Sequence, residues 1–394
     1  MFAGFRGSGS FAVDERPKNF REFILWRDPN GRTPLTALLS KTRSEGTDDP
    51  QIFWWEEQLD IIRLQLDDAT NMSAVDTTFT VDSGALQLNQ GDMILIETAQ
   101  DVGYTAELVE VSSVTSDTVF EGIRGAAGST AAIILDNTFM TRIGNSFEEG
   151  SLSADITGTN PDKLTNFCQI FKTAFGVTKT TDHIKLRTGP AFKNDRFRKM
   201  FRHSESLEQA FLWGKAAEIV TGSFPQRYAG GAREFITTSV TIFTVDPTED
   251  SFINAVTPIF DFHSEGAGDQ RLMLCGNGAM TTLNRLARDS TNSRINLGEV
   301  ITLYGMKLRR WILPMGELLV RTHPLLNVHP VHTNSMFILN PAGLIYRHLR
   351  DTAVEKNIQT PGEDVIKDQW LTESTLELRH ERTMAFIGEF KDFP

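Results

Sequence analysis

The sequence predicts an α+β fold that contains one long helix, a mixed helix and strand region, and a separate all-β segment. Apolar residues recur at steps of three and four through residues 193–220, which is the period of an amphipathic helix. Residues 73–132 show instead the two-residue alternation of short strands, with glycine-containing turns between them. The rest of the chain lacks the regular strand–helix alternation of a parallel sheet. We therefore expect an α+β protein with an inserted antiparallel β-barrel or sandwich.

The composition is ordinary for a globular protein. The chain has 394 residues, of which 40% are hydrophobic and 23% charged, enough for two or three compact units. No apolar run approaches the roughly 20 residues of a membrane-spanning helix, so no membrane partner is expected. Cys168 and Cys275 stand far apart in apolar surroundings, and this pattern predicts buried free thiols in a reducing cytoplasm.

Charge is distributed unevenly along the chain. Residues 44–162 hold three basic residues, Arg63, Arg124 and Arg142, against twenty-two acidic ones, a local charge of −19. The whole chain carries −12, so the remaining residues sum to +7. An acidic module repels phosphate and a separate basic surface accepts it, which would suit a protein between water and packed nucleic acid. The alternative is that the acidic loops only keep the protein in solution.

Residues 1–60 are predicted to form an N-terminal arm rather than a domain. Their one clear element is a short helix at 34–39, with Pro34 in its first turn and Thr33 as the N-cap. Little else in this stretch has the periodicity of a packed element.

Two adjacent tryptophans, Trp54 and Trp55, end the arm. An arm has no core of its own in which to bury such large rings, so they must lie on the body of the chain or on another molecule. We expect both to be buried, with the arm lying against neighbouring subunits.

The start of the predicted long helix is strongly basic. Arg196, Arg198, Lys199 and Arg202 fall in its first turns, where cations oppose the helix dipole. An anionic partner would compensate for this charge, either carboxylates of an adjoining loop or phosphate of nucleic acid. The alternative is that these are solvated surface side chains.

Motifs for catalysis and for cofactors are weak. Residues 275–281 lie between a strand and a helix, as a phosphate loop does, but they lack the third glycine of a dinucleotide fingerprint and the Gly-Lys-Ser/Thr of a P-loop. His323, His329 and His332 have no carboxylate or cysteine at metal-ligand spacing. We therefore expect no enzyme, no cofactor and no metal site.

Three passages together resemble the major capsid proteins of tailed bacteriophages, which have the Hong Kong 97 fold. Residues 32–39 (RTPLTALL) are similar to the arm motif of that family. Residues 166–171 (NFCQIF) with 177–180 (VTKT) are similar to the run that leads from the extended loop into the spine helix. Residues 337–350 and 373–378 resemble the closing strands of the peripheral domain.

The resemblance implies a domain organisation. After the arm, 1–60, come an extended loop region at 61–190 that includes the β insertion at 73–132, and a peripheral domain with the spine helix at 191–245. An axial domain at 246–330 and a return to the peripheral domain at 331–394 complete the chain.

The resemblance also implies a function. The chain is expected to be a structural subunit of an icosahedral phage capsid, assembled from hexamers and pentamers in the host cytoplasm. Its shell would enclose double-stranded DNA without reading sequence, and portal, scaffold and decoration proteins are further candidate partners. The alternative is another virion component, a decoration or tail protein, that binds a host surface through the acidic β segment.

Overall fold

The protein consists of two compact units, which we call the body and the β unit. In the computed structural model the body is Met1–Trp54 with Thr165–Pro394, and the β unit is Trp55–Leu164. The structure describes residues 33–40, 43–57, 63–68, 70–97, 106–151, 160–262, 268–289, 300–303 and 306–392. The chain contains helices and strands without a regular strand–helix alternation, so the predicted α+β class is confirmed.

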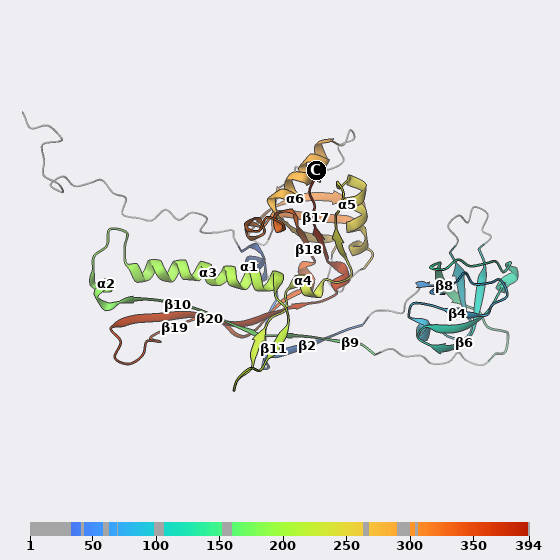
Figure 1. Cartoon of the computed structure of the whole chain (residues 1–394), viewed down its shortest axis with the longest axis horizontal. Coiled ribbons are helices and arrows are strands. Elements are labelled where there is room, and N and C mark those ends of the chain that lie inside the picture. Colours follow the sequence, from blue (N-terminus) through green and yellow to red (C-terminus); the bar gives the residue numbers. More distant parts are fainter. Residues whose placement is uncertain are drawn as a thin grey trace, which may run out of the picture. The chain divides into compact units, whose positions relative to one another are not determined.

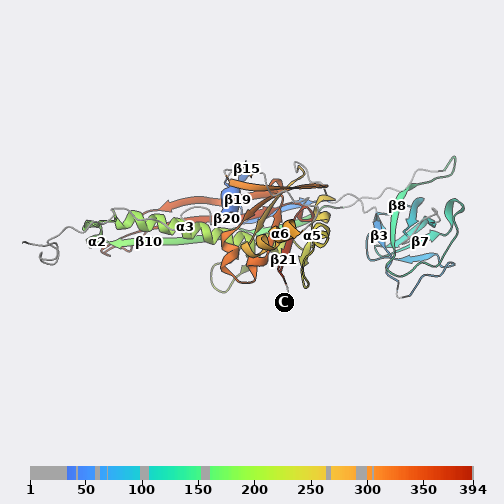
Figure 2. The same ribbon diagram turned by 90° about the horizontal axis from the view of Figure 1, so that it is seen from above.

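One sheet of the body is long and narrow. Its four strands lie in the order β1-β19-β20-β10. Their bounds are β1 (Ser44–Gly46), β10 (Gln169–Thr178), β19 (Leu344–Glu355) and β20 (Val365–Leu378). The β10–β20 ladder is antiparallel over the whole of β10, and the spine helix α3 (Ala191–Trp213) lies along this ribbon in both views (Figures 1 and 2). Phe171 and Phe175 of β10 are buried. Ile170 and Lys172, the neighbours of Phe171 along the strand, lie on the opposite face of the sheet and are exposed.

The spine helix is shorter than the predicted 193–220. It ends at Trp213 because the chain turns there through Gly214, where a Cβ would lie 2.2 Å from the carbonyl oxygen of Ala229. Only glycine permits that close approach. The following residues form a two-stranded hairpin, β11 (Ala217–Ile219) with β12 (Gln226–Tyr228), instead of further helical turns.

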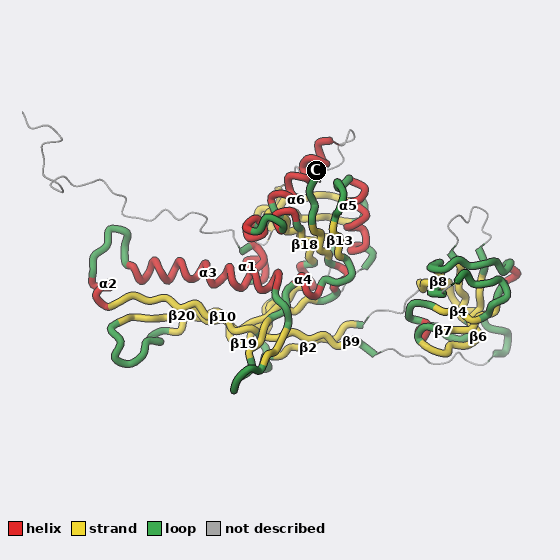
Figure 3. Tube along the Cα trace, viewed as in Figure 1, coloured by secondary structure: helices red, strands yellow, loops and turns green. Residues whose placement is uncertain are grey.

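The second sheet of the body has seven strands and two covered faces. Their order is β13-β21-β18-β14-β17-β16-β15. The bounds are β13 (Val240–Ile242), β14 (Gln270–Cys275), β15 (Val300–Leu303), β16 (Met306–Leu313), β17 (Gly316–Thr322), β18 (Met336–Leu339) and β21 (Ala385–Gly388). Helices α5 (Glu249–Val256) and α6 (Asn277–Asp289) share one hydrophobic cluster with it (Figure 3). Helix α1 (Pro34–Leu39) and the C-terminal half of α3 share the other cluster.

The remaining elements of the body and its link to the β unit are short. They are β2 (Gln51–Glu56) and β9 (Asp162–Phe167), which pair with each other, the helices α2 (Lys179–His183) and α4 (Ala232–Phe235), and the 3-10 turns η3 (Thr257–Phe260), η4 (Pro324–Val328), η5 (His332–Asn334), η6 (Pro341–Gly343) and η7 (Glu381–Thr383). The division between the two units falls within the β2–β9 pair.

The β unit is a six-stranded antiparallel sheet in the order β3-β8-β5-β6-β7-β4. Its elements are β3 (Arg63–Gln65), β4 (Thr78–Thr80), β5 (Asp92–Ile96), β6 (Leu108–Ser116), β7 (Val119–Ile123) and β8 (Phe139–Asn145), with the 3-10 turns η1 (Ala85–Gln87) and η2 (Ala126–Gly128). A bridge between Leu66 and Val81 joins the two edge strands and closes the sheet around its own hydrophobic core. The unit is wider than the predicted 73–132, because β3 and β8 lie outside that range and pair with each other.

Candidate assembly surfaces

The two tryptophans at the end of the arm have opposite surroundings. They are neighbours on β2, so their side chains point to opposite sides of the strand. Trp54 is only 5% exposed and packs on Phe235, with ring centroids 5.6 Å apart. Trp55 is 62% exposed, with the ammonium of Lys163 over its ring at 5.9 Å. Trp54 is therefore buried by its own chain, whereas Trp55 is exposed in the single chain, and its contact with a neighbouring subunit stays a prediction.

The basic residues predicted at the start of the spine helix form one cluster, which we call the α3 cations. They are Arg196, Arg198, Lys199 and Arg202, of which the three arginines are exposed and the lysine is half-buried. The guanidinium of Arg196 lies 5.6 Å from the ring of Trp370, whose indole Nε1 donates to the Arg196 carbonyl oxygen at 3.2 Å. Arg198 lies 3.5 Å from the carboxylate of Asp195.

These contacts only partly offset the charge of the α3 cations. An exposed ion pair is worth about 0–1 kcal/mol, and a cation near a helix N-terminus costs about 0.3–1 kcal/mol. The contact with the Trp370 ring orients Arg196 but supplies no negative charge. The cluster is therefore a positively charged surface on an exposed helix, and an anion outside the helix would stabilise it.

A buried carboxylate, Glu208, anchors the arm to the spine helix. Glu208 of α3 has no exposed surface, and its Oε1 accepts from the Leu35 amide at 2.7 Å. Its Oε2 accepts from the amide and from the hydroxyl of Thr36, each at 2.5 Å. The predicted N-cap, Thr33, makes no capping hydrogen bond. The orphan amides at the start of α1 are thus satisfied by a residue far away in the sequence.

The same carboxylate contacts the second sheet through His323. The imidazole Nε2 of His323 lies 2.8 Å from Glu208 Oε1, and neither side chain is exposed. The Leu325 amide donates to the other ring nitrogen, Nδ1, at 3.2 Å. Arg321, two residues before the histidine, is partly buried; burial lowers the pKa of its guanidinium and the charge of Glu208 raises it. Sequence reasoning missed Glu208, although its place between Leu207 and Phe211 on the apolar face was a signal of a buried charge.

The arm has two more anchors on the body. Strand β1 pairs in parallel with β19, and Arg347 of β19 bridges Glu45 and Glu377, each at 2.5 Å. Glu377 is fully buried and also accepts from Arg379 Nε at 2.5 Å. Residues 33–54 of the arm, where the structure describes them, therefore lie on their own chain, and the contact of the arm with neighbouring subunits stays a prediction.

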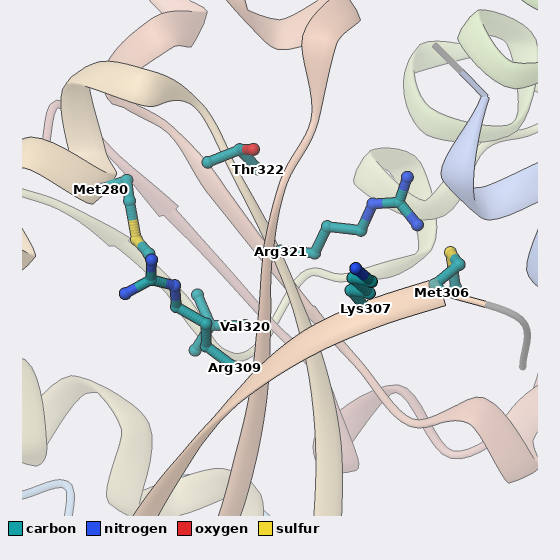
Figure 4. Close-up of a pocket in the computed structure, with 7 residues that line it drawn as sticks. All are labelled: Met280, Met306, Lys307, Arg309, Val320, Arg321 and Thr322. Carbon is teal, nitrogen blue, oxygen red and sulfur yellow. The ribbon is translucent and has the colours of Figure 1, made fainter. Parts of the chain in front are cut away.

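A cavity of about 410 Å³ near the start of β16 gathers three further cations. It is lined by Met280, Met306, Lys307, Arg309, Val320, Arg321 and Thr322. Arg309 is directly opposite Val320 in the β16–β17 ladder, so Arg321 belongs to the other face of the sheet. Figure 4 shows the Arg309 guanidinium beside Met280, and the Arg321 guanidinium pointing away from both. These cations do not converge on one point, so the cavity is not built for a single oxyanion.

The cysteines and histidines that the sequence offered as candidate site residues are buried or packed against aromatic rings. Burial raises the pKa of the Cys168 thiol to about 11 and that of the Cys275 thiol to about 12, so neither is a reactive thiolate. His332 stacks on Trp213 with ring centroids 4.1 Å apart, and the ring centroids of His329 and His332 are 4.4 Å apart. Among the described residues no group of three histidine, cysteine or acidic side chains is placed to hold a metal ion. Every helix in the described ranges is too short or too polar to cross a membrane.

In the β unit, the acidic segment is organised around one internal ion pair. Arg124 and Glu107 are both nearly buried and meet through Nε at 2.6 Å and Nη2 at 2.8 Å. Burial opposes ionisation of the Glu107 carboxyl, but hydrogen bonds from Arg124 and from the Ala132 and Gly125 amides, together with the charge of Arg124, hold its pKa below the usual value. Arg124 also donates to the carbonyl oxygens of Ser73 and Ala132. Arg124, one of the three basic residues of segment 44–162, therefore stabilises the unit internally and is not a surface cation.

Comparison with known proteins gives a family and several relatives. The model of the SU10 major capsid protein family matches residues 8–391. The major capsid protein of Pseudomonas phage PaMx41 is 27% identical over 376 residues, which cover 92% of this chain and 87% of that protein. Among solved structures, a Mycobacterium phage Bobi chain is 9% identical, with a TM-score of 0.49 and 98% and 99% of the two chains covered. The capsid of Myoviridae phage XM1 is 8% identical, with a TM-score of 0.47 and 97% and 99% covered.

The family match decides between the two functions that the sequence left open. It runs through the arm, both sheets of the body and the β unit, so it does not depend on one shared module. The arm, extended strands, spine helix and second sheet that the resemblance implied are all present. A decoration or tail protein would not match a shell-protein family from end to end. The chain belongs to the SU10 major capsid protein family and is a structural subunit of a phage capsid.

Proposed function

We propose that this capsid protein assembles through hexamers and pentamers into an icosahedral shell that encloses double-stranded DNA, and that assembly takes place in the host cytoplasm. The observation that carries the proposal is the long ribbon of β10, β19 and β20 with the N-terminal half of α3. Of residues 191–202, all of which are described, none is buried. Such an extended element gains stability when other copies cover it.

The α3 cations supply the charge for that contact. We favour carboxylates of a neighbouring copy as their partner, because a permanent interface compensates the charge more constantly than DNA does. The segment 44–162, with its local charge of −19, offers many such carboxylates. Phosphate of packaged DNA is the second candidate, and non-specific DNA contacts would use the same side chains.

Variants that remove the positive charge but keep a polar side chain distinguish these two partners. The double variant Arg198→Gln/Arg202→Gln should weaken capsomers even without DNA if the partner is a carboxylate. If the partner is phosphate, empty shells should form normally, and only filled particles should lose stability, with a strong dependence on salt. Lys307→Gln, an exposed cation on β16, is the matched control. No effect of the double variant on either kind of particle would mean that the α3 cations are only solvated.

Trp55 and the β unit complete the proposal. Trp55 is the exposed ring of the pair and is expected to be covered by another copy, so Trp55→Ala should reduce assembly without unfolding the subunit. The acidic β unit is expected on the outer surface, away from phosphate. Antibodies against residues 106–151 should therefore bind intact filled particles. Binding only to disrupted particles would place the unit inside.

Electron microscopy of the expressed chain tests the function itself. Closed polyhedral particles or rings of five and six subunits are expected. Fibres, trimers or dispersed monomers under all assembly conditions would contradict it.

A further inference from the structure

We propose that a groove in the β unit is a docking site for a separate protein, and that the segment it receives carries lysine or arginine beside large apolar side chains. The groove has a volume of about 500 Å³, which is within the range of ligand pockets in proteins. Its walls come from residues 132–135, from β3 and β8, and from the end of β5 with the residue before β6. This inference goes beyond shell formation and does not rest on it, because the whole groove lies within one unit of one chain.

Three apolar side chains line the groove and are exposed to solvent. Ile133 is 66% exposed, Leu135 61% and Phe139 39%. Ile134, between the first two, is buried in the core of the unit and forms a bridge with Met72. Because side chains alternate along an extended chain, this bridge turns both neighbours of Ile134 outward. Apolar side chains held together on a concave surface are typical of a site that another molecule covers.

Hydrogen bonds and an ion pair fix the walls of the groove. Arg63 Nε donates to Glu97 Oε1 at 2.8 Å, and the same guanidinium lies over the Phe139 ring at 3.8 Å. On the other wall, Glu107 Oε2 accepts from the Ala132 amide at 3.1 Å. The groove is therefore formed before a partner binds, and a preformed site loses less conformational entropy on binding.

The charge of the β unit favours a cationic partner. The three arginines of segment 44–162 all form ion pairs within the unit: Arg63–Glu97, Arg124–Glu107 and Arg142–Asp92. These pairs use up the positive charge of the segment and leave its net charge of −19 to the remaining carboxylates. A basic segment of another protein is attracted to such a surface, whereas nucleic acid or an acidic segment is repelled.

One of these carboxylates stands at the edge of the groove. Asp136 lies between Leu135 and Asn137, which both line it. Its Oδ1 accepts from the Asp68 amide at 3.2 Å and its Oδ2 from Asn137 Nδ2 at 2.6 Å, and both of these donors are neutral. A cation of the partner would therefore meet uncompensated negative charge next to the apolar surface. A segment with both kinds of side chain uses the two features together.

Binding of synthetic peptides to the full-length chain tests the groove. The probe is a dye-labelled peptide, KLKFKLK, in which basic and apolar side chains alternate, and fluorescence anisotropy measures its affinity. The peptide KGKSKGK has the same charge without the apolar side chains, and ELEFELE has the opposite charge. We expect KLKFKLK to bind at least about tenfold more tightly than either control peptide. Its affinity should fall as the salt concentration rises.

Two matched pairs of variants locate the binding. Leu135→Ser removes an apolar side chain from the groove, and Leu86→Ser removes one of similar exposure, 58%, from η1, which does not line it. Asp136→Asn removes the carboxylate at the edge, and Asp117→Asn removes one that accepts from the Gly84 amide elsewhere in the unit. We expect binding about fivefold weaker in each groove variant and unchanged in each control. Thermal denaturation shows that the variants are folded.

Equal affinity of Leu135→Ser and Leu86→Ser, both folded, would overturn the proposal. Equal binding of KLKFKLK and KGKSKGK, or no binding of either, would overturn it as well. Intact particles whose β unit is reached by antibodies should bind the probe as free subunits do. Binding to free subunits alone would mean that a neighbouring copy fills the groove, and would contradict a separate partner.

Discussion

The two halves of the spine helix α3 have the same apolar periodicity but opposite surroundings. In the C-terminal half, 203–213, five side chains are buried: His203, Leu207, Glu208, Phe211 and Leu212. In the N-terminal half, 191–202, the aromatic residues contact mainly the ribbon and one another, as Phe192 does with Phe175 at 5.4 Å and Phe197 with Phe201 at 4.7 Å. The second sheet and α1 cover only the C-terminal half.

This difference shows that periodicity specifies a helix but not its burial. A helix face becomes core only where a second layer lies opposite, and here that layer ends near His203. The C-terminal half therefore contributes to the stability of the subunit. The N-terminal half carries the α3 cations and is left for contacts between copies.

The largest expected effect compares one phenylalanine from each half. Phe211 is fully buried, so Phe211→Ala should lower the free energy of unfolding by about 3–5 kcal/mol. Phe197 is 40% exposed, so Phe197→Ala should cost only about 1 kcal/mol. Chemical denaturation of unassembled subunits measures both. Equal losses for the two variants would contradict the division of the helix.

A smaller effect is expected from His203, which stands at the junction of the halves. It is 2% exposed, and its ring nitrogens bond the hydroxyls of Thr173 at 3.0 Å and Thr372 at 2.8 Å. Burial lowers the pKa of His203, so the unfolded chain binds a proton more readily than the folded one. Its contribution to stability is therefore complete above the ordinary histidine pKa of about 6.5 and is lost as the pH falls below that value.

Denaturation at several pH values checks this linkage. Below pH 6.5 the wild-type chain should lose up to about 1.4 kcal/mol per pH unit from this one group. His203→Asn should remove that component of the slope, and His183→Asn, on the exposed helix α2, should not. A slope unchanged in His203→Asn would show that the buried histidine is not responsible.

The smallest effect on folding is expected from the α3 cations. Arg198→Gln/Arg202→Gln should change the free energy of unfolding of the free subunit by less than about 0.5 kcal/mol, because both side chains are exposed. A small gain is equally compatible, since the helix dipole opposes these charges. Thermal denaturation of subunits at low and high salt measures it. A loss of several kcal/mol would mean that the cluster is part of the folded core.

Local features of this fold were predictable, whereas long-range ones were not. The amphipathic period located α3, Pro34 located α1, and apolar neighbours correctly indicated that Cys168 and Cys275 are buried. The end of α3 was missed because it depends on Gly214 packing against Ala229, a contact that has no local sequence signal.

The candidate site shows the same limit. The α3 cations were predicted from spacing along one helix, and they lie on it as expected. The cap of α1 was assigned to Thr33, its immediate neighbour in sequence, but it comes from Glu208 on another element. Trp54 and Trp55 were treated alike, although only the fold decides which side of β2 meets Phe235. Partners far apart in sequence decide these contacts, and periodicity does not report them.

The central claim is that the N-terminal half of α3 is an inter-subunit surface and the C-terminal half belongs to the subunit itself. Hydrogen exchange of α3 in free subunits and in assembled shells tests it most directly. We predict that amides of 191–202 become protected on assembly, while those of 203–213 are already protected in free subunits and change little. Equal exchange of 191–202 in both states, or a change confined to 203–213, would contradict the account.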